Sequence, residues 1–355
     1  MLGASPTPRP AGRDLAFVRD GDIWLSNLGG TGSLQLTHDG RDSEPHWAPD
    51  GRRLLFLRGK GAEAELYSIG ADGSELRRLT NDRLEQKSPR WAPQGGLIAY
   101  VQPREAAGDG AADPDKATEI WTAHEDGSAA RKLVDGFDPA WSPDGLRLAY
   151  ATNGTRQAGP PAGAIDNALH LVNALGRNDA ELLPLGAIPR DLEPAYNLPF
   201  RPATRELRAP SWAADGRHLS ATADGHTGLA LTVDDKGADL KFWVLNYEGG
   251  VGRSDFAPRG NRLAVESRPA SGFAHVVVVD MDSDHKAEIG SEKLSYSAVE
   301  PAWAPDGEHL AVVTFSGAVG NPAGRRELLV FGSDGTAQSR VAVGNISRPA
   351  WNPLR

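Results

Sequence analysis

Short runs of alternating apolar and polar residues recur along the chain, and Gly, Pro or Asp bounds each run. In one example, Pro45-His-Trp47 is followed by the turn Pro49-Asp-Gly51, by two arginines and by the apolar residues 54–56. Alternating runs of this length joined by tight turns are typical of antiparallel strands. Pro presets φ in such a turn, Asp caps the backbone and Gly accepts a positive φ. The pattern therefore predicts an all-β protein.

The same unit returns along almost the whole sequence. Its copies begin at Glu44, Ser88, Asp138, Ala209, Arg253, Glu300 and Arg348. After the turn comes a second strand. A third strand follows, such as residues 65–68, and then a fourth, such as residues 77–80. Four strands in every repeat of about 40–50 residues predict the blades of a β-propeller.

The two ends of the chain complete the count of blades. The last copy, at Trp351, has no second strand after it, and residues 13–18 look like that missing strand. Strands from both termini would then close one blade and remove the open edge of the sheet. We expect seven blades, with six as the alternative. We expect residues 13–355 to form the propeller domain and the Pro-rich residues 1–12 to form a flexible tether or the trimmed end of an export segment, with an ordinary disordered terminus as the alternative.

These copies resemble the Pro-x-Trp-Ser-Pro-Asp-Gly repeat of TolB-type WD40-like (PD40) propellers. The best-preserved copies are residues 138–145 and 300–307. The resemblance covers nearly the whole chain and implies the fold, but that repeat serves many functions. It also implies an exported protein, periplasmic or at the cell surface, with a lipid tether through a missing N-terminal segment or a cytoplasmic location as alternatives.

The connections predict which face of the propeller binds a ligand. Turns from first to second and from third to fourth strands are short throughout. The long connections all belong to the other set, and they are residues 103–117, 153–167, 186–208 and 316–325. Variable loops on a rigid scaffold often carry function, so we expect binding on this insertion face. Neutral drift in tolerant loops is the alternative.

Two groups of residues are candidates for ligand binding on that face. The connection 186–208 concentrates residue types that are enriched at binding hot spots: Arg190, Tyr196, Phe200, Arg201 and Arg205. The residues that start the repeats should ring the mouth of the channel, and the charged ones are Glu44, Asp138, Arg253, Glu300 and Arg348. Alternatively, the aromatic residues anchor the loop and the ring of charges neutralises itself.

Composition narrows the function classes. A net charge of −9 and a pI near 5.5 argue against nucleic acid as a partner. The chain has no cysteine, and its nine histidines are scattered. We find no hydrolase, phosphate-loop or zinc-protease motif and expect no catalytic residue, metal site, cofactor or transmembrane segment.

The sequence thus predicts a monomeric, non-catalytic propeller that binds a protein, peptide or glycan. The alternative is a propeller enzyme, either a metal-dependent polysaccharide lyase or a glycan-active hydrolase, with its site at the channel mouth.

Overall fold

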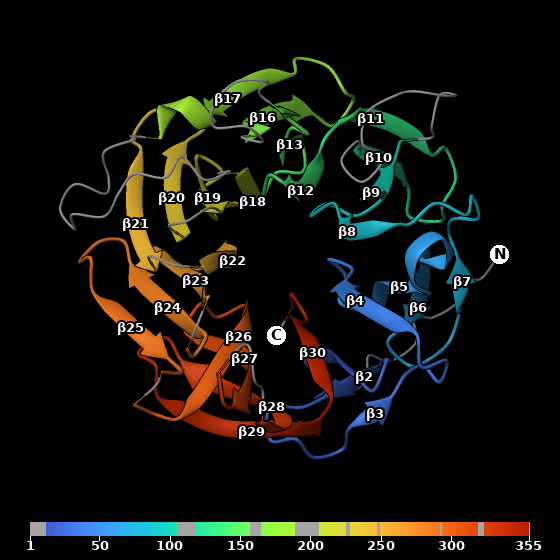
Figure 1. Cartoon of the computed structure of the whole chain (residues 1–355). Coiled ribbons are helices and arrows are strands. Elements are labelled where there is room, and N and C mark those ends of the chain that lie inside the picture. Colours follow the sequence, from blue (N-terminus) through green and yellow to red (C-terminus); the bar gives the residue numbers. More distant parts are fainter. Residues whose placement is uncertain are drawn as a thin grey trace.

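Seven antiparallel sheets of four strands stand around a central channel (Figure 1). The computed structural model describes residues 12–104, 118–156, 165–188, 206–224, 228–246, 249–270, 272–291, 293–318 and 323–354. Within these ranges the only helices are two short 3-10 turns, η1 (Gly61–Glu63) and η2 (Leu185–Ala187). The predicted all-β propeller with seven blades is confirmed, and the six-bladed alternative is wrong.

Each blade is numbered here and given from its innermost strand outward. Blade 1 consists of β4 (Asp42–Trp47), β5 (Arg53–Arg58), β6 (Glu65–Gly70) and β7 (Arg77–Arg78). Blade 2 consists of β8 (Lys87–Trp91), β9 (Leu97–Pro103), β10 (Thr118–His124) and β11 (Arg131–Asp135). Blade 3 consists of β12 (Phe137–Trp141), β13 (Arg147–Ala151), β16 (Ala168–Asn173) and β17 (Ala180–Pro184). Blade 4 consists of β18 (Glu206–Trp212), β19 (His218–Asp224), β20 (Gly228–Asp234) and β21 (Lys241–Asn246).

The remaining three blades complete the ring. Blade 5 consists of β22 (Gly249–Phe256), β23 (Arg262–Pro269), β24 (His275–Asp280) and β25 (Lys286–Ile289). Blade 6 consists of β26 (Tyr296–Trp303), β27 (His309–Ser316), β28 (Ala323–Gly332) and β29 (Ala337–Gly344). Blade 7 consists of β30 (Ile346–Trp351), β1 (Leu15–Arg19), β2 (Asp22–Ser26) and β3 (Leu34–Gln35). A small hairpin of β14 (Thr155–Arg156) and β15 (Ile165–Asp166) lies in the connection from β13 to β16.

Blade 7 closes the ring with strands from both termini, as the sequence predicts. β30 pairs antiparallel with β1, with Trp351 opposite Leu15 and Ile346 opposite Arg19. Beyond β30, the Asn352 side-chain amide donates to the carbonyl oxygen of Gly51 in the turn of blade 1 at 2.9 Å. The closing blade is therefore joined to its neighbour at the turn as well as through its packing.

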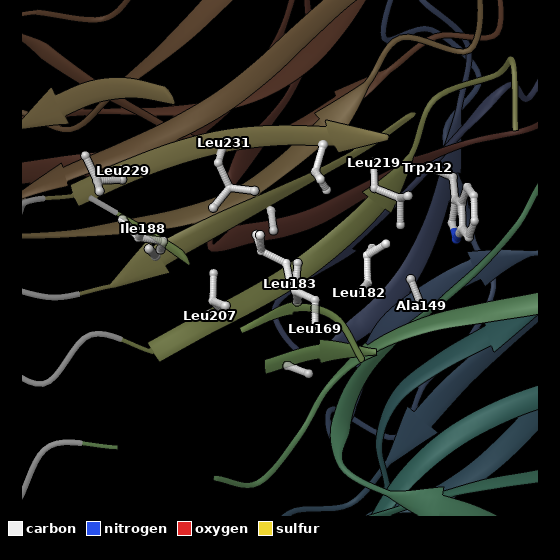
Figure 2. Close-up of a cluster of buried hydrophobic side chains, with 14 residues drawn as sticks. Ala149, Leu169, Leu182, Leu183, Ile188, Leu207, Trp212, Leu219, Leu229 and Leu231 are labelled. Carbon is white, nitrogen blue, oxygen red and sulfur yellow. The ribbon is translucent and has the colours of Figure 1, made fainter. Parts of the chain in front are cut away.

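Apolar side chains fill the spaces between neighbouring blades. Figure 2 shows one such cluster between blades 3 and 4, in which Leu169 and Leu183 of blade 3 face Leu207, Leu219 and Leu231 of blade 4. All five are buried. Burial of a leucine side chain contributes about 1.5–3 kcal/mol, so these layers hold adjacent sheets together.

The motif tryptophans fasten each innermost strand to the blade before it. In four copies the indole Nε1–H donates to the carbonyl oxygen of the residue between Pro and Trp in the preceding blade. These pairs are Trp47–Ala350, Trp212–Ala140, Trp303–Asp255 and Trp351–Ala302, at 2.9–3.1 Å. In Trp91 and Trp141 the buried indole nitrogen has no partner in the described part of the chain, and blade 5 carries Phe256 instead. These tryptophans therefore pack between neighbouring blades.

We predict that Trp303→Phe destabilises the protein more than Trp141→Phe. Both side chains are almost equally buried, at 9% and 8% exposed, but only Trp303 donates a hydrogen bond. The difference in the free energy of unfolding should be about 1 kcal/mol. Urea denaturation of the two variants measures it. Equal losses, or a larger loss for Trp141→Phe, would show that the hydrogen bond does not hold the blades.

Candidate functional site: the central channel

The residue before each motif proline lies in a bulge of the innermost strand. Six of the seven have left-handed backbone, with φ between 47° and 55°: Glu44, Ser88, Asp138, Ala209, Glu300 and Arg348. The pairing of each innermost strand shifts register here, for example between Ser43 and His46. Left-handed backbone is costly for residues other than glycine, so surrounding contacts must hold each bulge.

Acidic residues at the mouth supply that support. Glu44 accepts a hydrogen bond from the backbone N–H of Ser88 at 3.2 Å, and Asp138 accepts one from Ala209 at 3.0 Å. Glu300 likewise accepts from the N–H of Arg348. Each carboxylate therefore holds the bulge of the next blade along the ring.

The mouth also contains an ion pair across the closure. Arg348 Nη2 lies 3.6 Å from Glu44 Oε1, which links blade 7 to blade 1. The structure thus brings Glu44, Asp138, Arg253, Glu300 and Arg348 to one end of the channel, where they line a single cavity. Their proposed role in ligand binding stays a prediction.

Two adjoining cavities make up the channel. One, of about 690 Å³, reaches toward the Pro-Asp-Gly turns, and the other, of about 480 Å³, opens at the mouth. Both are lined by His46, Arg90, Asp138, Arg253 and Asp255. These five polar side chains therefore lie where the two cavities meet.

Most of this set occupies one position of the repeat, between Pro and Trp. Three copies place Ala there: Ala140, Ala302 and Ala350. The other four place His46, Arg90, Ser211 and Asp255. We define the waist as these four residues and Arg253. Sequence reasoning picked out Arg253 but missed the other four, although the departure from Ala was a visible signal.

The waist lies across the channel in two halves. His46 and Arg90 come from the adjacent strands β4 and β8, whereas Ser211, Arg253 and Asp255 come from β18 and β22 (Figure 1). In Figure 1, β22 lies on the far side of the ring from β4 and β8. Ligand that passes along the channel would meet both halves.

Burial and like charge govern ionisation at the waist. Burial, followed by the nearby Arg253, lowers the pKa of Arg90 to about 10, which leaves the guanidinium charged at neutral pH. Burial and the charges of Arg90 and Arg253 lower the pKa of His46 to about 3. Its Nδ1 accepts from the backbone N–H of Trp91 at 3.5 Å, which fits a neutral ring. Burial raises the pKa of Asp255, against the opposing effect of Arg253 and of a hydrogen bond with Ser211.

The rest of the predicted site cannot be placed. Arg190, Tyr196, Phe200, Arg201 and Arg205 lie outside the described residues. The described ends of two long connections lie on the side of the mouth. Ala151, ahead of the connection 153–167, pairs with Phe137 at the start of β12, and Ser316, at the start of the connection 316–325, pairs with Tyr296 at the start of β26. No group of three or more His, Asp or Glu that could hold a metal ion occurs among the described residues.

This ring of four-stranded blades with an axial channel defines the chain as a β-propeller. The model of the TolB β-propeller domain (PD40) matches residues 2–185, which is more than half of the sequence. The chain belongs to this family. The resemblance seen in the repeats is thereby confirmed.

Known relatives include both peptidases and TolB proteins. The uncharacterized peptidase YuxL of Bacillus subtilis is 28% identical over 193 residues, covering 42% of this chain and 29% of that protein. The chain thus spans less than a third of this relative. TolB from Acinetobacter baumannii superposes with a TM-score of 0.51 at 16% identity, covering 88% of this chain and 66% of that one. Prolyl oligopeptidase B from Galerina marginata gives 0.55 at 14% identity, covering 86% and 44%. At these identities the solved structures bear on the fold alone.

No helix in the described ranges has the length and apolar character needed to cross a membrane.

We predict that His46 makes stability depend on acidic pH. Its pKa is about 3 in the folded protein, against an ordinary value of 6.5. Between these values the unfolded chain binds a proton that the folded chain does not, so the free energy of unfolding falls as the pH drops from 6.5 toward 3. This one residue contributes a slope of up to about 1.4 kcal/mol per pH unit.

The His46→Gln variant should lose that part of the slope, and the exposed His38→Gln should keep it. Urea denaturation from pH 4 to pH 7.5 measures the slopes, and the imidazole resonances of His46 report its titration directly. A His46 ring that titrates near 6.5 would contradict the burial argument.

Proposed function

We propose that this protein is a non-catalytic binding propeller that takes an extended peptide segment of a partner protein into its channel from the insertion face. The observation that carries the proposal is the waist. Four of seven equivalent positions depart from the alanine that the repeat uses elsewhere, and the departing side chains all line the channel. A purely structural channel would need no such departures.

Several features of the channel favour a peptide over a globular surface as the occupant. The cavities of about 690 and 480 Å³ adjoin along the channel, and the larger one is lined by Trp47, Trp91, Trp141 and Trp212 together with the polar groups of the waist. Apolar walls with a few fixed polar groups suit an extended peptide, whose side chains and backbone offer both apolar surface and hydrogen-bonding groups. A glycan is the second ligand class that this lining admits.

The loop at residues 186–208 belongs to the same proposal. Its described end, β18, starts at Glu206 and reaches the mouth at Ala209. We propose that Arg190, Tyr196, Phe200, Arg201 and Arg205 extend the binding surface outward from the mouth. Residues of these types commonly contribute more than about 1 kcal/mol each at interfaces.

The proposal extends to the cellular setting. We propose that the protein acts outside the cytoplasm, as a monomer, tethered through residues 1–12 or a lipid-bearing segment ahead of them. The family membership and the name of one relative, Tol-Pal system protein TolB of Methylobacillus flagellatus, support this setting.

Selection from a displayed random-peptide library tests the proposed function. Peptides enriched on the native chain should lose binding to Ala302→Trp, which fills the channel from blade 6. They should also bind less well to the triple variant Tyr196→Ala, Phe200→Ala, Arg201→Ala. The loss should be about tenfold or more, as expected for removal of hot-spot contacts.

The matched control is Lys236→Trp, an equally bulky change at an exposed position in the turn from β20 to β21, on the opposite face. Its binding should equal that of the native chain, and melting curves should show that all variants fold. If the peptides bind Ala302→Trp normally but do not bind Lys236→Trp, the binding site lies on the face of the Pro-Asp-Gly turns, which contradicts the proposal.

A further inference from the structure

Two arginines at the waist lack a carboxylate partner of the kind that other half-buried arginines, such as Arg58 and Arg262, have. Arg58 pairs with Asp42 at 2.6 Å, and Arg262 pairs with Glu308 at 2.9 Å. Among the described residues, neither Arg90 nor Arg253 has a carboxylate oxygen within 4.0 Å. The one hydrogen bond that the guanidinium of Arg90 makes there is to the carbonyl oxygen of the adjacent Pro89, at 2.8 Å.

The carboxylates that line the same cavity have other hydrogen bonds. Glu44 and Asp138 accept from the backbone N–H groups of the neighbouring blades' bulges, and Glu44 also contacts Arg348. Asp255 bonds to Ser211. Arg90 and Arg253 therefore line the same channel with like charges, and neither forms an ion pair with a carboxylate in the described part of the chain.

Such an arrangement is unfavourable in an empty site and favourable in an occupied one. Burial is the main cause that lowers the pKa of Arg90, and the like charge of Arg253 lowers it further. The carboxylates of Glu44, Asp255 and Asp138 act in the opposite direction. An anion bound between the two arginines would reduce the repulsion between their charges. It would also accept charge-assisted hydrogen bonds from both guanidinium groups. The neutral ring of His46 adds no charge but offers a further polar edge beside Arg90.

We propose that Arg90 and Arg253 form a carboxylate-binding site at the waist of the channel, which receives an acidic side chain or the C-terminal carboxylate of the peptide ligand. The inference names the ligand chemistry and rests on the proposed function for its biological meaning. A monoanion fits better than a phosphate dianion, because Asp138 and Asp255 line the same cavity and would repel the second charge.

Isothermal titration with small probes tests the site independently of any partner. The first probe is N-acetyl-glutamate methylamide, and the second is its uncharged isostere, N-acetyl-glutamine methylamide. We expect the glutamate probe to bind with a Kd of the order of 1 mM. The glutamine probe should bind at least about tenfold more weakly, because it lacks charge-assisted hydrogen bonds. Quenching or enhancement of tryptophan fluorescence gives a second readout, since Trp47 and Trp91 line the same cavity.

Variants locate the binding. Arg90→Gln and Arg253→Gln should each weaken the glutamate probe about tenfold, and Arg253→Lys should restore part of the loss. The control Arg217→Gln removes an exposed arginine at the turn between β18 and β19 and should change nothing. Because two separate arginines are tested, a failure of one variant to fold leaves the other as the test.

Three results would overturn the assignment. Equal affinities for the two probes would show that charge is not recognised. Unchanged binding in both folded Gln variants would place the anion elsewhere. Tighter binding of inorganic phosphate than of the glutamate probe would make this a phosphoryl site. Because the probes are small, a positive result stands even if the peptide selection finds no ligand, and the two proposals fail separately.

Discussion

The pairing of β30 with β1 is the constraint on which the rest of the molecule depends. Without it, blade 7 loses its innermost strand, and blades 6 and 1 lose the surface between them. The channel exists only because seven innermost strands stand side by side, and β30 is one of them. Trp351 and Asn352 extend the closure to both neighbours, through Ala302 of blade 6 and Gly51 of blade 1. A site built on the axis therefore inherits its geometry from contacts between the two ends of the chain.

Within that ring, stability and binding use neighbouring positions of one repeat. The residue before the motif proline supports the fold, because Glu44, Asp138 and Glu300 satisfy the backbone of the next blade. The residue after the proline varies from copy to copy, and four of the five waist residues occupy this position. Among the described residues, the indole nitrogens of Trp91 on β8 and Trp141 on β12 have no hydrogen-bond partner. An unpaired buried donor costs about 1–3 kcal/mol, so these two tryptophans stabilise the contacts of blade 2 with blades 1 and 3 less than a hydrogen-bonded tryptophan would.

The sequence predicts the scaffold far better than the site. The motif recurs in seven copies, of which three keep Pro-Asp-Gly intact and six keep the tryptophan, so blade positions and even the closing strand at residues 13–18 follow from it. The waist depends on which side chains from separate blades meet on the axis, and spacing along the chain does not reveal that. The departure of His46, Arg90 and Asp255 from alanine is visible in the sequence, but nothing in the sequence shows that these three side chains line one channel. The residues of the 186–208 loop remain predictions, since no repeat constrains their conformation.

The central claim is that ligand occupies the channel at its waist. The chain has no cysteine, so Ala302→Cys would introduce a single thiol into the channel wall. The most direct measurement is the rate at which a small thiol reagent labels this residue, with and without a saturating peptide selected on the native chain. The account predicts rapid labelling of the free protein and strong protection by the peptide. Labelling that is equally fast in both states would contradict it.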